Sequence, residues 1–202
     1  MNMSPNAGTA AEPPVKLVVL GDSLSAGYGL PADEAFPAKL AKALAAKGMA
    51  VTITNAGVSG DTASDGLSRL DWSVVDGTEA VIVELGANDA LRGIDPALTK
   101  SALDKILRKL GDRHIAVMLA GMQAPRNMGP DYVKAYDALY PALASAHPVV
   151  FYPFFLDGVA TDPKLNQPDG LHPTASGVDV IVSRILPKAE ELIARARKAR
   201  GS

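Results

Sequence analysis

Short runs of apolar residues recur five times along the chain, separated by longer stretches in which apolar residues follow helical spacing. The first run is rich in Val and Leu with almost no polar alternation, which is typical of a strand buried on both faces of a parallel sheet. We therefore predict a strand in each run. The five predicted strands span 15–20, 51–54, 80–85, 115–120 and 149–155.

The stretches between these runs predict helices, and some of their ends carry the expected signals. Asp95 and Pro96 form an N-cap and first-turn pair, whereas Gly48 and Gly111 lie where helices should stop. Strands that alternate with helices favour an α/β fold with a parallel sheet, right-handed crossovers and helices on both faces. The predicted helices span 34–47, 61–70, 96–110, 131–146 and about 174–197.

The length of 202 residues and the even composition favour one domain over 15–202, with a core large enough to be stable. Residues 1–14 are small and polar with no apolar segment, so we predict a flexible leader that is neither a signal peptide nor a membrane span. The composition of this leader is also consistent with the part that remains after an upstream export signal has been removed. We expect a periplasmic or secreted protein in that case and a cytoplasmic one otherwise.

Charge and cysteine content exclude several classes of function. Lys and Arg total 20 against 22 Asp and Glu, a formal charge of −2, so no basic field favours nucleic acid or an anionic membrane surface. Cysteine is absent, which excludes disulfides, thiolate nucleophiles and sulfur-ligated metals. The chain can therefore work in either redox environment.

Polar side chains and glycines follow several predicted strands at the point where each strand ends. Ser23 comes directly after the first strand, Gly60 follows the second and Asn88 the third, while Asp169 and His172 lie beyond the fifth. In parallel sheets, ligands bind at the carboxyl ends of the strands. We therefore expect these residues to gather at one edge of the sheet.

The three histidines can be sorted by their positions relative to the strands. His114 and His147 directly precede predicted strands, so they belong to the opposite edge, and only His172 can reach Ser23. Serine needs such a base to become a nucleophile, and the imidazole needs an acceptor, for which Asp169 is the nearest candidate.

Acyl transfer also needs hydrogen-bond donors aimed at the developing oxyanion. The backbone N–H groups of Ser23 and Gly60 and the side-chain amide of Asn88 are the available set. We therefore predict a serine hydrolase that works through an acyl-enzyme.

Each of these residues also has an ordinary structural explanation. Ser23 alone is a typical helix N-cap or turn residue, and Asp169 with His172 could simply cap the last helix. The hydrolase hypothesis depends on complementary roles meeting at one edge of the sheet, which independent caps would not supply.

Two hypotheses from other classes remain open. Asp22, Asp61 and Asp89 also follow strands and could hold Mg²⁺ in a phosphoryl-handling domain of similar topology. A non-catalytic, flavodoxin-like binding module is the other, although neither nucleotide-binding glycine motif is present.

Four sequence blocks resemble those of the GDSL, or SGNH, hydrolase family, whose four letters fall on Ser23, Gly60, Asn88 and His172. The resemblance covers nearly all of 15–195, and within the family it is similar to the bacterial multifunctional thioesterase, arylesterase and lysophospholipase branch. The blocks are Gly21-Asp22-Ser23-Leu24, Gly57-Val58-Ser59-Gly60-Asp61-Thr62, Gly86-Ala87-Asn88-Asp89 and Asp169-Gly170-Leu171-His172-Pro173.

This resemblance implies a flavodoxin-like three-layer α/β/α sandwich with a central parallel sheet of about five strands. It also implies a Ser-Asp-His triad and hydrolysis of esters and thioesters without a cofactor or a metal. Ala87 departs from the pattern, since that branch often has a second glycine there, and its methyl group is expected to narrow the approach beside Asn88. An α/β-hydrolase is excluded, because Ser25 replaces the last glycine of the G-x-S-x-G elbow.

The expected substrates are small molecules: aryl and short- to medium-chain acyl esters, acyl-thioesters and lysophospholipids. The segment 90–96, which holds Gly93 between apolar residues, is a candidate mobile gate. Apolar residues in the loops after the third, fourth and fifth strands are candidates for an acyl groove, although Met and Phe clusters are also ordinary core. The groove candidates are Leu91, Ile94, Met122, Pro125, Met128, Phe154 and Phe155.

Overall fold

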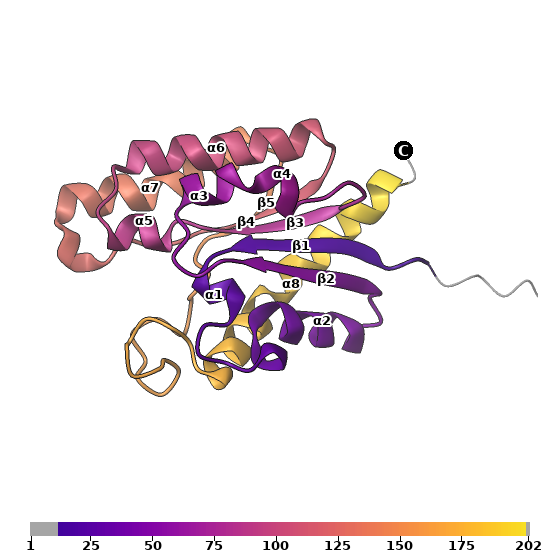
Figure 1. The fold of residues 1–202 in the computed structure, drawn as a ribbon, viewed down its shortest axis with the longest axis horizontal. Helices are drawn as coiled ribbons and strands as arrows, with labels where there is room; N and C mark the ends of the chain where they lie inside the picture. The colour runs from indigo at the N-terminus through magenta and orange to yellow at the C-terminus, as the bar shows by residue number, and fades with distance from the viewer. Residues whose placement is uncertain (1–11, 201–202) are drawn as a thin grey trace, which may run out of the picture.

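The structure is a computed structural model that describes residues 12–200. Most of the predicted leader, residues 1–11, lies outside the described residues. Its described end contacts the last helix: Arg200 donates to the carbonyl oxygens of Pro13 and Pro14, both at 2.7 Å, and Glu12 lies 3.3 Å from Arg197. In Figure 1 both ends of the described chain therefore lie at the same side of the molecule.

A five-stranded parallel sheet forms the centre of the fold, with the order β2-β1-β3-β4-β5 (Figure 1). The chain moves outward from β1 to β2, then crosses to the other side of β1 to continue with β3. Ligands bind at such a switch point, outside the carboxyl ends of the strands. The strands are β1 (Val15–Gly21), β2 (Val51–Gly57), β3 (Ala80–Glu84), β4 (Ala116–Ala120) and β5 (Val150–Tyr152).

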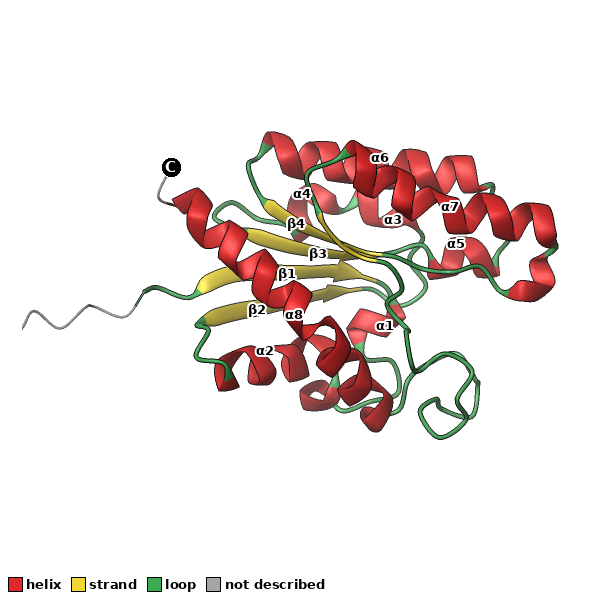
Figure 2. Cartoon of the chain, turned by 180° about the vertical axis from the view of Figure 1, so that it is seen from behind, coloured by secondary structure: helices red, strands yellow, loops and turns green. Residues whose placement is uncertain are grey.

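Helices cover both faces of the sheet, so the predicted α/β/α architecture is confirmed (Figures 1 and 2). One face carries α2 (Phe36–Ala46) and α8 (Ala175–Arg200), which pack side by side. The other face carries α3 (Ala63–Ser68), α4 (Leu70–Ser73), α6 (Pro96–Asp112) and α7 (Pro130–Ala146). Short helices complete the chain: α1 (Ser23–Ala26), η1 (Ala32–Glu34), α5 (Ala87–Leu91) and η2 (Arg126–Met128).

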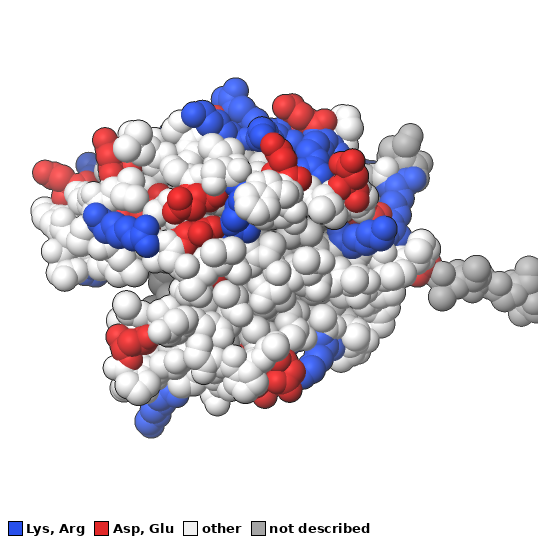
Figure 3. All heavy atoms as spheres, in the orientation of Figure 1, with Lys and Arg blue, Asp and Glu red and all other residues white. Residues whose placement is uncertain are grey.

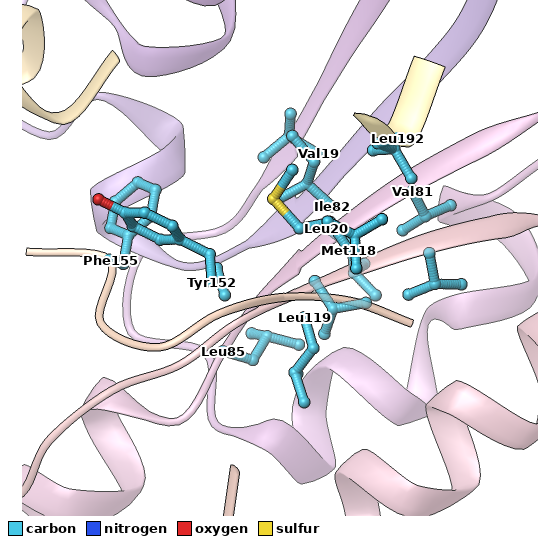
Figure 4. Packing of buried hydrophobic residues seen from close by; sticks show 14 of the residues in the cluster. Val19, Leu20, Val81, Ile82, Leu85, Met118, Leu119, Tyr152, Phe155 and Leu192 are labelled. Carbon is cyan, nitrogen blue, oxygen red and sulfur yellow. The ribbon is translucent and has the colours of Figure 1, made fainter. Parts of the chain in front are cut away.

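The central strands form the core because their side chains are apolar on both faces. Val19 of β1, Ile82 of β3 and Met118 of β4 are fully buried, and Leu192 of α8 covers them from one side (Figure 4). The edge strand β2 is not buried on both faces as β1 is, since Val51 and Ile53 are half-buried and Thr52 and Thr54 are exposed. That alternation fits an edge strand with one face toward solvent.

Several predicted boundaries need correction for local reasons. The single helix predicted over 61–70 is two helices, because Thr62 caps α3 through a capping box with Asp65 and the chain turns at Arg69. Gly111 lies inside α6, which continues to Asp112. The strand predicted to reach residue 155 ends at Tyr152, since Pro153 has no N–H for the ladder.

The surface adds two observations. On the face shown in Figure 3, charged side chains of both signs gather over α3, α4 and α6, whereas the surface over the middle of the sheet is largely uncharged. Among residues 12–200, no helix is long and apolar enough to cross a membrane.

Candidate active site

Ser23 is the first residue of the four-residue helix α1, which begins directly after β1 and Asp22. The Asp22 carboxylate caps this helix by accepting the Leu24 N–H at 2.9 Å. Gly27 ends it in the left-handed conformation, with φ of 83°. Capping at both ends fixes Ser23 at the carboxyl edge of the sheet, where the sequence predicts it.

His172 and Asp169 reach this edge from the long loop between β5 and α8, orange in Figure 1. The Nε2 of His172 lies 2.9 Å from Ser23 Oγ, and its Nδ1 lies 2.6 Å from Asp169 Oδ2. The other oxygen of Asp169 accepts the backbone N–H groups of Leu171 and His172 at 2.9 and 3.0 Å. The structure thus brings the three predicted triad residues into one hydrogen-bonded chain.

The charge of Asp169 fixes the roles of the two imidazole nitrogens. Hydrogen bonds from the backbone and side chain of His172, and from the Leu171 N–H, lower the pKa of Asp169 to about 2. Asp169 is therefore ionised at neutral pH and only accepts hydrogen bonds, so Nδ1 of His172 carries the proton. The Nε2 of the neutral ring is then free to accept the hydroxyl proton of Ser23.

The other two histidines lie at the amino ends of strands, as predicted. His114 precedes β4, and His147 precedes β5 with its Nε2 2.7 Å from Asp104 Oδ1. Neither is at the edge that holds Ser23.

Asn88 lies on the short helix α5, which the sequence pattern did not predict. Its Nδ2 donates to the carbonyl oxygen of Asp61 at 2.9 Å and to Asp22 Oδ2 at 3.2 Å. Gly60 lies in the turn after β2 with φ of +89°, and its carbonyl oxygen accepts from Arg92 Nη2 at 2.7 Å. The Asn88 side chain therefore connects the residue after β1, Asp22, with the turn after β2, where Gly60 directly precedes Asp61.

Three tyrosines of α7 hold the segment that carries Asn88, and the sequence reasoning did not identify them. They are spaced four residues apart, so their side chains lie on one face of the helix. Gly86 has φ of +118°, and a Cβ there would collide with two of the tyrosine hydroxyls. The hydroxyls of Tyr132, Tyr136 and Tyr140 donate to the carbonyl oxygens of Ile94, Gly86 and Leu85 at 2.8, 2.6 and 2.8 Å.

Arg69 is a second support that the sequence reasoning missed. Its guanidinium group donates to Asp61 Oδ2 at 2.6 Å and to the carbonyl oxygen of Gly21 at 2.9 Å. Arg69 and Asp61 are both largely buried. The pair ties the turn after β2 to the end of β1, directly before the segment that carries Ser23.

A pair of buried carboxyl groups lies beneath Ser23. Ser25 Oγ donates to Glu84 Oε2 at 2.6 Å, while Glu84 Oε1 has no hydrogen-bond partner among the described residues. Burial, followed by the nearby Asp22 charge, raises the pKa of Glu84 well above its ordinary value. Burial also raises the pKa of Asp22 to about 6. The site therefore favours the protonated, uncharged form of the Glu84 carboxyl group, whose Oε2 contacts Ser25 of α1.

A cavity of about 530 Å³ opens beside Ser23, Asn88 and His172. Its walls are mainly apolar, and four of the predicted groove residues line it: Leu91, Met122, Pro125 and Phe154. Residues that the sequence reasoning missed complete the walls, and half of them come from the loop between β5 and α8. These include Leu24, Leu156, Ala160, Thr161 and Leu171.

Three predicted groove residues are not among those that line this cavity. Phe155 is 1% exposed and lies among the buried apolar residues of Figure 4. Its ring packs edge-on against that of Phe36, with centroids 5.0 Å apart. Met128 lies against Gly93, and Ile94 is held through its carbonyl oxygen by Tyr132. Mobility of the segment 90–96 stays a prediction.

The three aspartates of the magnesium hypothesis do not form a common site. Asp22 caps α1, Asp61 pairs with Arg69, and Asp89 accepts from the Ala63 N–H and the Thr99 hydroxyl, both at 2.9 Å. Within the described part of the chain, no group of three or more His, Asp or Glu side chains is arranged to hold a metal ion.

Comparison with known proteins gives consistent matches over most of the chain. The model of the GDSL-like lipase/acylhydrolase family matches residues 19–180. An arylesterase of Vibrio mimicus is 41% identical over 165 residues, which cover 81% of this chain and 82% of that enzyme. The "Thioesterase 1/protease 1/lysophospholipase L1" of Escherichia coli strain K12 is 36% identical over 178 residues, covering 88% of this chain and 84% of that enzyme.

A solved structure agrees with these sequence matches. The crystal structure of AlinE4, described as an SGNH-hydrolase family esterase, superposes with a TM-score of 0.77 at 43% identity. The match covers 90% of this chain and 98% of that one.

Proposed function

Because the chain belongs to the GDSL-like lipase/acylhydrolase family, we propose that it is a serine esterase that hydrolyses small carboxylic esters through an acyl-enzyme on Ser23. The observation that carries this proposal is the hydrogen-bonded chain from Ser23 Oγ through His172 to Asp169, with distances of 2.9 and 2.6 Å. That arrangement supplies a nucleophile, a base and an orienting carboxylate.

In the acylation step, Ser23 Oγ attacks the carbonyl carbon of the substrate while His172 Nε2 takes the hydroxyl proton. Asp169 holds the imidazole through Nδ1 and stabilises its positive charge. When the tetrahedral intermediate collapses, His172 gives the proton to the leaving alkoxide or thiolate, and the acyl group remains on Ser23. Water activated by His172 then releases the acid and restores the serine.

The oxyanion of the tetrahedral intermediate needs donors that are already in place. We assign this role to the backbone N–H groups of Ser23 and Gly60 and to the Asn88 amide. The Asn88 amide already meets an acceptor with each N–H, and the longer contact, 3.2 Å to Asp22 Oδ2, is the one that the oxyanion would share. The tyrosines of α7 keep the amide in position for this.

The cavity supports a choice of substrate class. Its mainly apolar walls, with Ser23, Asn88 and His172 at one side, suit an acyl chain whose carbonyl group lies at the serine. Aryl esters and short- to medium-chain acyl esters are the proposed substrates, and the names of the relatives add thioesters and lysophospholipids.

A rate series on p-nitrophenyl esters from acetyl to palmitoyl, run beside an acyl-thioester and a lysophospholipid, tests this proposal. We expect turnover that peaks at short or medium chains and falls by several orders of magnitude in both Ser23→Ala and His172→Ala. Ligand binding without turnover, or turnover near the parent rate in either variant, would instead support a non-catalytic module or another nucleophile.

A further inference from the structure

The segments that carry Ser23 and His172 are 149 residues apart in the sequence, yet their side chains must meet within hydrogen-bond distance. Ser23 lies on α1, whereas His172 lies on the loop between β5 and α8. A long loop needs a fixed attachment if it is to hold a side chain within a few tenths of an ångström. Gln167 provides an attachment of this kind.

The Gln167 side chain joins the two segments directly. Its Nε2 donates one hydrogen bond to the carbonyl oxygen of Tyr28 at 2.8 Å, five residues after Ser23. The same nitrogen donates to the carbonyl oxygen of Pro173 at 2.9 Å, directly after His172. Since an amide nitrogen carries two hydrogens, both are used, one toward each segment.

The backbone of Gln167 closes the turn that holds Asp169 and His172. Its N–H donates to the carbonyl oxygen of His172 at 2.7 Å, and its own carbonyl oxygen accepts the Gly170 N–H at 2.9 Å. The neighbouring residue Asn166 forms an isolated antiparallel bridge with Pro173. The turn from 166 to 173 is therefore closed by its own hydrogen bonds, and the Gln167 side chain attaches it to Tyr28, two residues after the end of α1.

Tyr28 couples the other end of this attachment to both Ser23 and His172. Its N–H donates to the carbonyl oxygen of Ser23 at 3.1 Å, so its position follows that of α1. Its ring lies against the imidazole of His172, with centroids 4.5 Å apart and planes tilted by 36°. An aromatic ring at this distance restricts the orientation of the imidazole.

The chain also leaves room for Gln167 at the next position. Gly29 has φ of +74°, and a Cβ at this position would collide with Gln167 Oε1. A side chain at residue 29 would therefore displace the Gln167 amide from its present position beside Tyr28.

We infer that Gln167 is a positioning residue, which sets the distance between His172 Nε2 and Ser23 Oγ by tying the Asp169–His172 turn to Tyr28. The inference rests on the proposed function, because it concerns the proton transfer between those two atoms. Gln167 is not among the cavity-lining residues, so its effect falls on the chemical step rather than on acyl binding.

The first test measures kcat and KM of Gln167→Leu and Gln167→Glu on a p-nitrophenyl ester. Leucine removes both donors, and glutamate keeps the shape but places oxygens against two carbonyls. We expect kcat to fall by about tenfold to a hundredfold in both, with KM within about twofold, because small displacements of reacting groups cost this much. A kcat equal to that of the parent enzyme, or a loss confined to KM, would overturn the inference.

A matched control separates positioning from general loosening of the fold. Lys39 Nζ also ties distant segments together, donating to the Ala175 carbonyl oxygen at 2.9 Å and to Asp179 Oδ1 at 2.7 Å. Thermal unfolding and kcat of Lys39→Met are measured beside those of Gln167→Leu. We expect Lys39→Met to lower Tm with kcat retained, and an equal fall in kcat for an equal fall in Tm would assign Gln167 a purely structural role.

A double-mutant cycle with His172→Ala completes the test, since removing one member of a triad leaves measurable catalysis. If Gln167 acts through His172, then adding Gln167→Leu to His172→Ala should cost nothing further. The same fold-loss in both backgrounds would refute this. Failure of the proposed function is distinguishable, because Ser23→Ala and His172→Ala would then retain full activity.

Discussion

The buried acid beneath Ser23 gives a sharp prediction about stability and pH. Glu84 is fully buried on β3, its Oε2 accepts from the Ser25 hydroxyl, and burial raises its pKa, so the folded state holds the Glu84 proton more tightly than the unfolded chain does. In the unfolded chain it titrates near its ordinary pKa of 4.5. The stability that Glu84 contributes is therefore complete below that pH and is lost as the pH rises toward the folded pKa.

The magnitude follows from proton linkage. When the folded state holds one proton that the unfolded state has lost, the free energy of unfolding falls by about 1.4 kcal/mol for each unit by which the pH rises. Glu84→Gln keeps the shape but cannot ionise, so this slope disappears. We expect the stability of the variant minus that of the parent to rise with pH above about 5.5, by up to about 1.4 kcal/mol per pH unit, until the pH reaches the folded pKa of Glu84.

Urea unfolding at several pH values, followed by far-UV circular dichroism, measures this difference. Trp72 is 77% exposed, so its fluorescence is a poor probe of unfolding. Glu79→Gln is the control: its ion pair with Arg200 lowers the pKa of Glu79, which is ionised in both states above pH 5.5, so its difference should be flat in this window. If the difference in stability between Glu84→Gln and the parent also stays constant with pH, then the pKa of Glu84 is not raised in the folded state.

Three further predictions concern the site itself. Asp169→Asn should lower kcat by about 10⁴, because the amide no longer fixes the His172 tautomer, and steady-state kinetics with an unchanged kcat would contradict this. Asn88→Ala should lower kcat by about 10²–10³ with little change in KM, as expected for an oxyanion donor, whereas a change in KM alone would assign Asn88 to substrate binding. Tyr136→Phe removes one of the two donors to the Gly86 carbonyl oxygen and leaves the Ala90 N–H, so urea unfolding should report a loss of about 0.5–1.5 kcal/mol, and kcat should fall because Asn88 shifts. If neither stability nor kcat changes, Tyr136 does not support Asn88.

The sheet could be predicted because its central strands are continuous apolar runs. Such runs can be recognised from the local sequence without knowledge of tertiary contacts. It also located the segments of Ser23, Asn88 and His172, since chemistry at a parallel sheet gathers where strands end. The short helices α1 and α5 were not predicted, because four or five residues carry too little periodicity to be distinguished from a turn.

The supports of the site could not be predicted from local patterns. Tyr132, Tyr136 and Tyr140 carry a visible spacing, but only the packing of α7 against the end of β3 brings their hydroxyls to backbone carbonyls. Much of the cavity wall comes from a loop without regular structure. Which of the loop's residues line the cavity therefore depends on tertiary contacts. Phe155 illustrates the limit: its apolar side chain suits a groove and a core equally, and the structure places it in the core.

The most direct measurement of the central claim is covalent labelling of the active enzyme with a serine-directed phosphonate, followed by peptide mass spectrometry. The account predicts one adduct, on the peptide that contains Ser23, formed at the same rate as activity is lost and almost absent in His172→Ala. Two results would contradict it: full inactivation without an adduct on Ser23, or full labelling of Ser23 without loss of activity.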